Sequence, residues 1–528
     1  MCKYIFVSGG VVSGLGKGIT MAAIGRLLKE RGIKVSALKM DPYMNIDPGT
    51  MSPLQHGEVF VTNDGAETDL DLGHYERFMD VELNQYSNIT SGRIYWEVLS
   101  KERKGDYLGN TVQVIPHITS EIKRLMKLAA QHSGCDVLLC EIGGTVGDIE
   151  SQPFLEAVRQ MFQESARDQY LCLHVTLVPY VNASQEFKSK PTQHSVKQLQ
   201  SYGIMPDIII ARSEKQLPKE TLRKISSFCN MEESCVISNY DQSSLSEVVP
   251  MLHEAGISEL IKDKLQLTYI EQEDITWEAL LNKGSHASQT VHVGIIGKYV
   301  SLHDAYLSVV EALHHAAIDY EAKLILHWID SEELEHQDVV KACRVCDAIV
   351  IPGGFGQRGI KGMLLAVQYA REHEVPLLGI CLGMQVMCIE FARNVLGFKA
   401  ADSTEFQQTT QHPIITMMDE QYHITQIGGT MRLGAYPCTI QKDSHLYTIY
   451  QQQQISERHR HRYEFHHDYL AMFEAHGMLA SGRGTHGLVE AVELKEHPFY
   501  IGVQFHPEFQ SRPNRPHPLF LSLIRAAL

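Results

Sequence analysis

Near its N-terminus the chain reads Tyr4-Ile5-Phe6-Val7-Ser8-Gly9-Gly10-Val11-Val12-Ser13-Gly14-Leu15-Gly16-Lys17-Gly18-Ile19-Thr20. A short apolar run typical of a buried strand leads into a glycine-rich turn, and an amphipathic stretch at residues 19–31 follows. Glycines let backbone amides approach phosphate oxygens, the N-terminus of a helix is partly positive, and Lys17 adds a full charge. We therefore expect a strand–loop–helix unit that binds a nucleotide phosphate, and we favour this over a glycine turn that binds nothing.

This loop departs from the strict P-loop, in which a glycine and four further residues precede Gly-Lys-Ser/Thr. Here five residues separate Gly10 from Gly16, and Gly18 stands in the place of the hydroxyl residue. Because that hydroxyl normally contacts Mg²⁺, other groups must hold the ion. We expect Asp71 and Glu141 to do so, since Mg²⁺ prefers carboxylates with phosphate oxygens and Glu141 ends an apolar run, where ligands bind in open α/β sheets.

Short apolar runs alternate with amphipathic stretches along the first half of the chain. The runs lie at residues 4–8, 35–39, 137–140, 173–179 and 208–211. A second series, at residues 291–299, 324–329, 348–352 and 376–380, follows polar segments that begin after about residue 267. The alternation predicts an α/β protein with two tandem doubly wound, mostly parallel sheets. We predict domains at residues 1–267 and 291–528, joined by a linker at residues 268–290.

The composition is that of a soluble globular protein. The chain has 528 residues, 44% of them apolar, and a formal net charge of −16. This acidity argues against a general nucleic-acid or membrane-surface binder, so an anionic ligand requires a local basic pocket. The 11 cysteines show no zinc-ribbon or disulfide spacing and are typical of reduced cytosolic thiols. Without a leader-like start or an apolar run of about 18 residues, we expect a cytoplasmic protein.

One local basic pocket is expected at Lys188-Ser189-Lys190-Pro191-Thr192-Gln193, where two ammonium groups, two hydroxyls and an amide lie within six residues. Such a set suits a second phosphorylated ligand, although a solvated basic loop explains these residues equally well by themselves. Lys39, at the end of a predicted strand, is a further candidate for a phosphate contact.

A second site is expected where an apolar strand leads through Cys381, flanked by small residues, into a helix. This pattern is typical of a nucleophile elbow, and the helix N-terminus favours a thiolate. Downstream, His506 and Glu508 lie two residues apart at what reads as a strand end, so that both side chains would share one face. We predict that His506 is the base for Cys381 and that Glu508 orients the imidazole, rather than that Cys381 is a core residue. A glycine turn at residues 352–356 would supply further amides for an oxyanion.

The run Arg458-His459-Arg460-His461-Arg462-Tyr463-Glu464 has the composition of a metal or nucleic-acid patch. Neither cysteines nor an ordered ligand spacing lie nearby, so a metal is not favoured. A fixed guanidinium that binds a substrate carboxylate is the preferred interpretation.

Taken together, these motifs resemble those of the CTP synthase family along essentially the whole chain. The matching strings are residues 9–18, 39–43, 55–61, 69–78, 141–150 and 188–193. The C-terminal half resembles a class I (triad) glutamine amidotransferase through residues 379–383 and 506–508.

The resemblance implies a P-loop-like, dethiobiotin-synthetase-like synthetase domain followed by the amidotransferase domain. It implies a ligase of pyrimidine biosynthesis that uses ATP and Mg²⁺ to phosphorylate the 4-oxygen of UTP. Ammonia, released from L-glutamine through a glutamyl thioester and led through an internal passage, then displaces phosphate to give CTP. The resemblance further implies feedback inhibition by CTP, activation by GTP linked to residues 428–434, and a homotetramer, with no nucleic-acid or membrane partner.

The same resemblance implies roles for individual residues. ATP is expected at Gly14, Leu15, Gly16, Lys17, Gly18, Ile19, Lys39, Asp71, Tyr240 and Asp241, and Mg²⁺ at Asp71 and Glu141. UTP or CTP is expected at Ser13, Asp148, Ile149, Glu150, Lys188, Ser189, Lys190, Pro191, Thr192, Gln193 and Lys224. Glutamine is expected at Gly354, Leu382, Gly383, Met384, Gln385, Glu405 and Arg462, around the catalytic Cys381, His506 and Glu508.

The chain departs from the family pattern in two places. Gly14 replaces a serine common in bacterial members, with little consequence because backbone amides bind the phosphate. Residues 405–428 look short, which would trim a lid near the glutamine site and weakens the expectation of GTP activation.

Two other protein classes compete with this interpretation. A regulatory or filament-forming nucleotide binder would not need intact Lys17, Asp71, Cys381, His506 and Glu508. An ATPase of the chromosome-partitioning type would leave Cys381 and His506 without a role and would require a basic DNA-binding surface.

Overall fold

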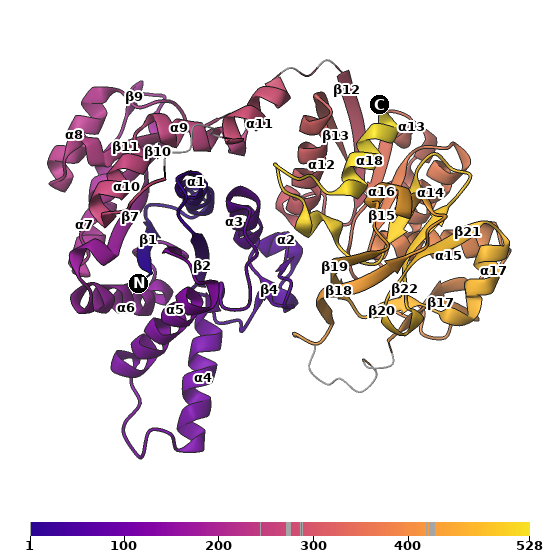
Figure 1. Ribbon diagram of the computed structural model, residues 1–528, viewed down its shortest axis with the longest axis horizontal. Coiled ribbons are helices and arrows are strands. Elements are labelled where there is room, and N and C mark those ends of the chain that lie inside the picture. The colour runs from indigo at the N-terminus through magenta and orange to yellow at the C-terminus, as the bar shows by residue number, and fades with distance from the viewer. Residues whose placement is uncertain are drawn as a thin grey trace. The chain divides into compact units, whose positions relative to one another are not determined.

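The computed structural model describes residues 2–242, 244–270, 276–285, 287, 289–418, 421 and 428–528. The chain divides into two compact units (Figure 1). The first consists of Met1–Pro48 and Asp71–Leu281, and the second of Gly49–Leu70 and Asn282–Leu528. A segment of the N-terminal half therefore belongs to the second unit.

The first unit is built on a seven-stranded parallel sheet with the strand order β11-β10-β7-β1-β6-β2-β5. Its strands are β1 (Lys3–Gly9), β2 (Val35–Asp41), β5 (Asn88–Thr90), β6 (Val137–Ile142), β7 (Tyr170–Leu177), β10 (Ile208–Ser213) and β11 (Val236–Tyr240). They run parallel because a helix connection separates each from the next, as the alternating apolar and amphipathic pattern predicts. The predicted runs at residues 4–8, 35–39, 137–140 and 208–211 each lie within one of these strands. The run predicted at residues 173–179 corresponds to β7, which begins three residues and ends two residues earlier than predicted.

Helices cover both faces of this sheet. They are α1 (Lys17–Glu30), α3 (Asp71–Met79), α4 (Ser91–Lys104), α5 (Thr119–Ser133), α6 (Gln152–Glu164), α7 (Lys190–Ser201), α8 (Lys219–Cys229), α9 (Val248–Glu254) and α10 (Ile257–Leu265), and α11 (Thr276–Ser285) follows them in sequence. Alternate strand residues such as Phe6, Leu38 and Leu138 pack against α4, α5 and α6. On the other face α1 packs with α3, α9 and α10. Strand order reverses around β1, so the loop after β1 opens at the crevice where such sheets bind ligands.

The second unit contains a mixed nine-stranded sheet with the order β13-β12-β14-β15-β23-β22-β21-β18-β19. Its parallel part comprises β12 (Gln289–Gly297), β13 (Ala322–Asp330), β14 (Ala348–Ile351), β15 (Leu377–Ile380) and β23 (Tyr500–Val503). Its antiparallel part comprises β18 (Arg432–Ile440), β19 (Gln454–His461), β21 (Met478–Arg483) and β22 (Val489–Leu494). A separate sheet pairs β16 (Ala401–Ser403), β17 (His412–Met417) and β20 (Tyr463–Phe465). The expected α/β class is confirmed in both units, but the second sheet is parallel only in part.

Helices also sandwich this second sheet. The core on one face includes residues of α12 (Leu307–Asp319), α16 (His445–Tyr450) and α18 (Pro518–Ala527). The core on the other face includes residues of α13 (Val339–Cys343), α14 (Ile360–Glu372), α15 (Leu382–Asn394) and α17 (Leu470–Ala475). None of the helices in the described part of the chain is long and apolar enough to span a bilayer.

Residues 49–70 form small elements within the second unit: α2 (Pro53–His56), β3 (Phe60–Val61) and β4 (Glu67–Thr68). Specific polar bonds hold this segment. The Glu58 carboxylate accepts hydrogen bonds from the backbone N–H and hydroxyl of Ser308, and Arg458 donates to the Asn63 side chain (2.6 Å) and the Val61 carbonyl (3.0 Å). The second unit is therefore built from both halves of the sequence.

The polar stretch that was expected as a linker contains the helix α11, and Trp277 attaches this helix to the first unit. The indole ring is 1% exposed, lies 5.0 Å from the ring of Phe78 and donates to the Ser246 carbonyl at 2.8 Å. The Arg26 guanidinium lies over the same ring. Residues 271–275, 286 and 288 of this stretch lie outside the described residues.

We predict that Trp277→Ala lowers the stability of the first unit by about 3–5 kcal/mol, because it removes a buried aromatic ring and leaves a cavity. A lower Tm in thermal unfolding would show this loss. Trp96→Ala is the matched control, since Trp96 is 64% exposed and its removal should change the stability by less than about 0.5 kcal/mol. Equal Tm values for the two variants would contradict the proposed anchoring role of Trp277.

Candidate active sites

The first candidate site surrounds the glycine-rich loop between β1 and α1. Gly14 and Gly16 have φ values of +72° and +76°, in the left-handed region that glycine adopts without strain. The helix α1 begins at Lys17, which is only 7% exposed and donates from Nζ to the Gly144 carbonyl at 2.8 Å. Burial lowers the pKa of Lys17. The loop therefore joins exposed backbone at residues 11–14 to a buried cation and a helix N-terminus, which together suit a phosphate.

Gly18 allows two carboxylates to approach the start of α1. A Cβ atom at this position would lie 2.4 Å from Asp71 Oδ1 and 3.3 Å from Glu141 Oε2. Asp71 begins α3 and Glu141 lies in β6, so the two carboxylates come from distant parts of the chain. In the strict P-loop a hydroxyl residue occupies this position, whereas here the missing side chain makes room for the acids. The structure thus brings together both residues that were expected to hold Mg²⁺.

Lys39 of β2 bridges these two carboxylates. Its ammonium group donates to Asp71 Oδ2 and, at 3.0 Å, to Glu141 Oε1, and the Tyr75 hydroxyl donates to Glu141 Oε2 at 2.5 Å. Burial acts to raise the pKa of Asp71, but the positive charge of Lys39 outweighs it and lowers the pKa. Lys39 therefore favours the anionic form of Asp71 next to the phosphate loop. Two carboxylates beside a phosphate site are a donor set that fits Mg²⁺.

The other residues expected at nucleotides lie in several places. Tyr240 ends β11 and Asp241 follows it, at the same carboxyl edge of the sheet as the loop after β1, and Arg212 donates to the Asp241 carboxylate at 2.5 Å. Asp148 accepts hydrogen bonds from the backbone N–H and hydroxyl of Thr145 within its own loop. Ser13, Ile149, Glu150 and Lys224 are exposed.

The expected basic pocket around residue 190 is partly engaged within the protein. Lys188 pairs with Glu186, Lys190 lies over the ring of Phe228, and Thr192 is buried, where its hydroxyl donates to the Leu177 carbonyl. The buried Gln193 amide donates to the Ser189 hydroxyl. Pro191 occupies the first turn of α7, which begins at Lys190.

The second candidate site is a nucleophile elbow in the second unit. Cys381 lies between β15 and α15 with φ +53° and ψ −101°, a strained conformation for a residue other than glycine. A Cβ at Gly379 would lie 2.8 Å from the Gly383 carbonyl carbon, and one at Gly383 would lie 2.1 Å from the Ile351 carbonyl oxygen. Only glycine fits on either side of the cysteine. The turn therefore presents the Cys381 side chain at the N-terminus of α15, as the sequence pattern predicts.

His506 and Glu508 form a close pair beside this thiol. His506 Nδ1 lies 2.7 Å from Glu508 Oε1, while His506 Nε2 is buried and has no hydrogen-bond partner among the described residues. Strand alternation, which was expected to align the two side chains, is not the reason for their pairing. β23 ends at Val503, and residues Pro507–Gln510 form a short 3-10 helix that turns Glu508 back toward the imidazole.

The charge state of this pair follows from its surroundings. Burial by itself would lower the pKa of His506, but the Glu508 carboxylate and the Cys381 sulfur raise it to about 10. A Cβ added to Gly353 would lie 2.9 Å from His506 Cε1 and 3.8 Å from Cys381 Cβ, so thiol and imidazole converge at one glycine. The arrangement places the Cys381 sulfur beside a histidine whose protonated form is favoured, the kind of surroundings that activate a cysteine nucleophile.

A pocket opens onto this triad. Its lining includes Cys381, His506 and Glu508, the glycine turn at residues 353–354, and Arg460. Pro53, Glu58 and Val59 of the segment 49–70 line it as well. This segment contributes to the family resemblance, but the sequence assigned it no chemical role. Its place beside the thiol could be found only from the fold, because these three residues lie more than 300 positions from Cys381 in the sequence.

The residues expected to contact glutamine surround the pocket to different degrees. Gly354 lies next to Leu382, since a Cβ at Gly354 would lie 3.2 Å from Leu382 Cδ2. Met384 is fully buried in the core, Gln385 donates to the Tyr463 carbonyl at 3.1 Å, and Arg462 donates to Gln421 at 2.6 Å. Glu405 accepts a hydrogen bond from the Gly356 N–H at 2.7 Å, and burial raises the pKa of its carboxyl group. Gly383 packs against β14.

Lys298 is a buried residue near this pocket that sequence reasoning did not identify. Its ammonium group donates to the carbonyls of Phe355 and Gly356, and burial lowers its pKa to about 8. It thereby holds the turn that carries Gly354. A lysine directly after the strand that ends at Gly297 was the available signal, because the carboxyl ends of parallel strands collect functional groups.

The arginine- and histidine-rich run is not a nucleic-acid patch. Arg458 and His459 are fully buried and His461 is 1% exposed. The first four residues of the run form the second half of β19, and two of its arginines, Arg458 and Arg460, contact the segment 49–70: Arg460 pairs with Glu67 at 2.8 Å. Residues 419–420 and 422–427 of the stretch that looked short lie outside the described residues.

Known families match both halves of the chain. Residues 3–267 match the family described as CTP synthase N-terminus, and residues 301–526 match glutamine amidotransferase class-I. The chain is 55% identical over 529 residues to a CTP synthase of Carboxydothermus hydrogenoformans, covering 100% of this chain and 99% of the relative. It is 54% identical over 534 residues to a CTP synthase of Symbiobacterium thermophilum, with the same coverage. The solved glutaminase domain of Trypanosoma brucei CTPS with bound acivicin is 38% identical over 45% of this chain and 93% of its own, with a TM-score of 0.42.

We predict a pH-dependent stability difference between the wild type and Glu508→Gln. The pKa of His506 rises from 6.5 to about 10 on folding, so the ion pair stabilises the wild type fully near pH 6, and this contribution is lost as the pH rises from about 6.5 to about 10. The variant should unfold at a lower temperature than the wild type at pH 6, and the two Tm values should converge near pH 10. Glu496→Gln, at an exposed acid, is the control. A Tm difference that grows with pH would contradict a charged His506.

Proposed function

Because the chain belongs to the CTP synthase family, we propose that it aminates UTP to CTP at the two sites described above, with ATP and glutamine as the other substrates. It is a glutamine-hydrolysing ligase by family. The observation that carries the residue assignment is that one chain holds both a thiol–imidazole–carboxylate triad at an elbow and a phosphate loop beside two carboxylates. Neither competing class, the nucleotide-binding regulator or the partitioning ATPase, uses both.

The triad residues hydrolyse glutamine. His506 takes the thiol proton of Cys381, and the thiolate attacks the side-chain carbonyl carbon of glutamine. The oxyanion that forms is stabilised by backbone N–H groups of the glycine turn at residues 353–354 and of the start of α15. His506 then donates its proton to the departing ammonia, which leaves a glutamyl thioester. Water, deprotonated by His506, releases glutamate and restores the thiol, while Glu508 keeps the imidazole oriented in every step.

The glycine-rich loop and Lys17 bind the phosphates of ATP and position the terminal phosphoryl group for transfer to the 4-oxygen of UTP. The new phosphate ester makes a good leaving group at carbon 4. Ammonia attacks that carbon, phosphate departs, and CTP remains after loss of a proton. Each turnover thus consumes one UTP, one ATP, one glutamine and one water, and yields CTP, ADP, phosphate and glutamate.

Asp71 and Glu141 would hold Mg²⁺, which neutralises charge on the transferring phosphoryl group when it is bound. The approach of both carboxylates to Gly18, and the lowered pKa of Asp71, support this assignment. Lys39 bridges the same two carboxylates, so a bound cation would share them with the lysine ammonium.

Further parts of the proposal rest on the family resemblance. Residues 1–267 form the synthetase domain, residues 268–290 the linker and residues 291–528 the amidotransferase domain. Lys188–Gln193 with Lys224 serve UTP and the feedback inhibitor CTP, residues 428–434 serve GTP as an activator, and the chain acts as a homotetramer. The 11 free cysteines support a cytoplasmic location, because disulfides are rare in reducing compartments.

We predict that Cys381→Ala abolishes synthesis of CTP from glutamine, by roughly 10³-fold or more, and leaves synthesis from ammonium chloride unchanged. The thiol is needed only to release ammonia, so an external nitrogen source should bypass it. The absorbance change from UTP to CTP, with ATP and Mg²⁺ present, measures both reactions. Cys388→Ala, at a buried cysteine within the helix α15 that follows Cys381, is the control. If the wild type makes no CTP from either nitrogen source, even with GTP added, the synthase assignment fails.

We predict that Gly18→Ala, unlike Cys381→Ala, impairs CTP synthesis with either nitrogen source and leaves glutamine hydrolysis intact. The new Cβ would press on Asp71, so synthesis of CTP should fall by about 10²-fold with ammonia and with glutamine alike. Glutaminase activity, measured as release of glutamate, should stay near the wild-type rate. Gly284→Ala is the control, because a Cβ at that helical position meets only Ile318 at an ordinary 3.5 Å. Loss of glutamate release together with CTP synthesis would point to unfolding instead of a local effect on the carboxylates.

A further inference from the structure

The side chains of β19 point alternately to two sides, as strand geometry requires. Arg458 and Arg460 contact the segment 49–70 through Val61, Asn63 and Glu67. His459 and His461 alternate with these arginines in sequence and therefore point to the opposite side of the strand. Their imidazoles meet there, with 3.1 Å between His459 Nδ1 and His461 Nε2.

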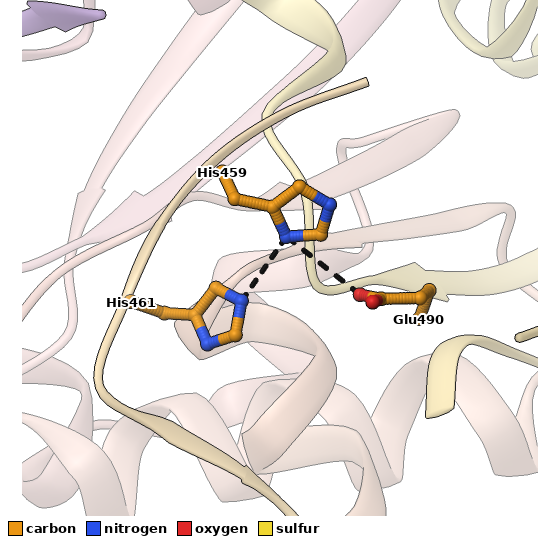
Figure 2. A group of neighbouring side chains, drawn as sticks. All are labelled: His459, His461 and Glu490. Atoms are coloured by element: carbon orange, nitrogen blue, oxygen red, sulfur yellow. Dashed lines mark hydrogen bonds and ion pairs between the residues drawn. The ribbon is translucent and has the colours of Figure 1, made fainter. Parts of the chain in front are cut away.

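A third ligand-type group joins the two histidines from β22. Glu490 Oε2 lies 3.6 Å from His459 Nδ1, and one ligand atom from each of the three residues lies within 4.8 Å of the others. Figure 2 shows the two rings and the carboxylate converging. All three side chains are at most 1% exposed. The sequence run of arginine and histidine lacked a further ligand nearby, and the fold supplies one from 29 residues downstream of His461.

The protons in this cluster can be placed from its hydrogen bonds. His461 Nδ1 lies 3.0 Å from the Tyr463 carbonyl, so this nitrogen carries the proton and Nε2 presents a lone pair to the cluster. Arg432 donates to Glu490 Oε1 at 2.6 Å, whereas Oε2 has no hydrogen-bond partner among the described residues.

Neither tautomer of His459 satisfies this cluster by itself. With the proton on Nδ1, His459 can donate to His461, but Glu490 Oε2 and His459 Nε2 stay buried without a donor. With the proton on Nε2, the lone pairs of His459 Nδ1, His461 Nε2 and Glu490 Oε2 face one another without a donor. A buried polar atom without a hydrogen-bond partner destabilises the folded state. A cation between the three atoms would engage His459 Nδ1, His461 Nε2 and Glu490 Oε2 together.

The spacing fits a transition-metal ion. Ligand atoms about 2.0–2.1 Å from a tetrahedral Zn²⁺ lie about 3.3 Å apart. The separations of 3.1 and 3.6 Å from His459 Nδ1 fall on either side of that value, and the third pair of atoms lies within 4.8 Å. Two imidazole nitrogens and one carboxylate oxygen suit Zn²⁺ and its neighbours, whereas Mg²⁺ prefers oxygen ligands alone. The positive charge of Arg432 weakens the site but also orients the carboxylate, leaving Oε2 for the ion.

We propose that His459, His461 and Glu490 bind a divalent cation of the Zn²⁺ class that ties β19 to β22 beside the glutaminase triad. The proposal does not depend on which reaction the triad performs. The Arg458 carbonyl accepts the His506 N–H at 2.7 Å, and the Cys381 thiol lies 3.8 Å from the Arg460 carbonyl. An ion on the other side of β19 would therefore fix the strand that touches both the nucleophile and its base.

The test is metal binding to the full-length, untagged protein in a Cys381→Ser background, which removes the reactive thiol as a competing ligand. After treatment with a chelator, Zn²⁺ is titrated by calorimetry and Co²⁺ by visible absorption. We expect one equivalent of either ion, the d–d bands of four- or five-coordinate Co²⁺ without sulfur charge-transfer bands, and a higher Tm with Zn²⁺.

Glu490→Gln and His461→Gln should each weaken binding by at least about 10-fold, since each removes one of three ligands. His476→Gln, at an exposed histidine of the same unit, should bind like the parent. Equal affinity in all variants would overturn the site, and so would sulfur charge-transfer bands or the absence of uptake by the folded parent. If the two variants do not fold, the spectrum and stoichiometry of the parent decide the question alone. A parent that takes up no ion would leave the cluster as a neutral hydrogen-bonded pair beside an Arg432–Glu490 ion pair.

Discussion

Both sites depend on how closely backbone can approach a functional group at the carboxyl end of a parallel strand, and glycine sets that distance. At the phosphate loop the missing Cβ of Gly18 lets Asp71 and Glu141 reach the first turn of α1. At the elbow the missing Cβ atoms of Gly379 and Gly383 let α15 begin directly against β14 and β15. In each case a helix N-terminus and a charged side chain meet in a space that any larger residue would fill, so the local dipole and the charge act on the same ligand atom.

Several lysine and arginine side chains of this acidic chain are buried. Lys17, Lys39, Lys298, Arg432 and Arg458 are all buried, and each donates to a carbonyl or a carboxylate. A buried cation that lost its partner would be costly, so these groups fix the loops to which they bond. Of these, Lys17 and Lys39 lie beside the glycine-rich loop, so a net charge of −16 is compatible with a local positive charge for the phosphates of a nucleotide.

Local patterns predicted the strands, the phosphate loop and the elbow, because each is encoded by consecutive residues. The β-strand runs of both halves and the turn at Cys381 lie where periodicity and glycine spacing indicated. Pairings between distant residues could not be read in this way. The sequence placed His506 and Glu508 on one strand face, whereas a 3-10 turn brings them together, since Pro507 cannot continue the ladder. Nor could it show that residues 49–70 join the second unit, or that Glu490 lies beside His459, because these contacts arise from strand order and not from spacing.

The strand β19 shows how one alternating sequence can serve three purposes at once. Its arginines hold the segment 49–70, whose Pro53, Glu58 and Val59 line the pocket of the triad. Its backbone carbonyls contact His506 and Cys381 directly. Its histidines face the other side, toward Glu490 of β22. These three sets of contacts all arise within the eight residues of one strand. The position of the segment beside the pocket and the geometry of the triad are therefore coupled through β19, and an ion bound by its histidines would stabilise both together.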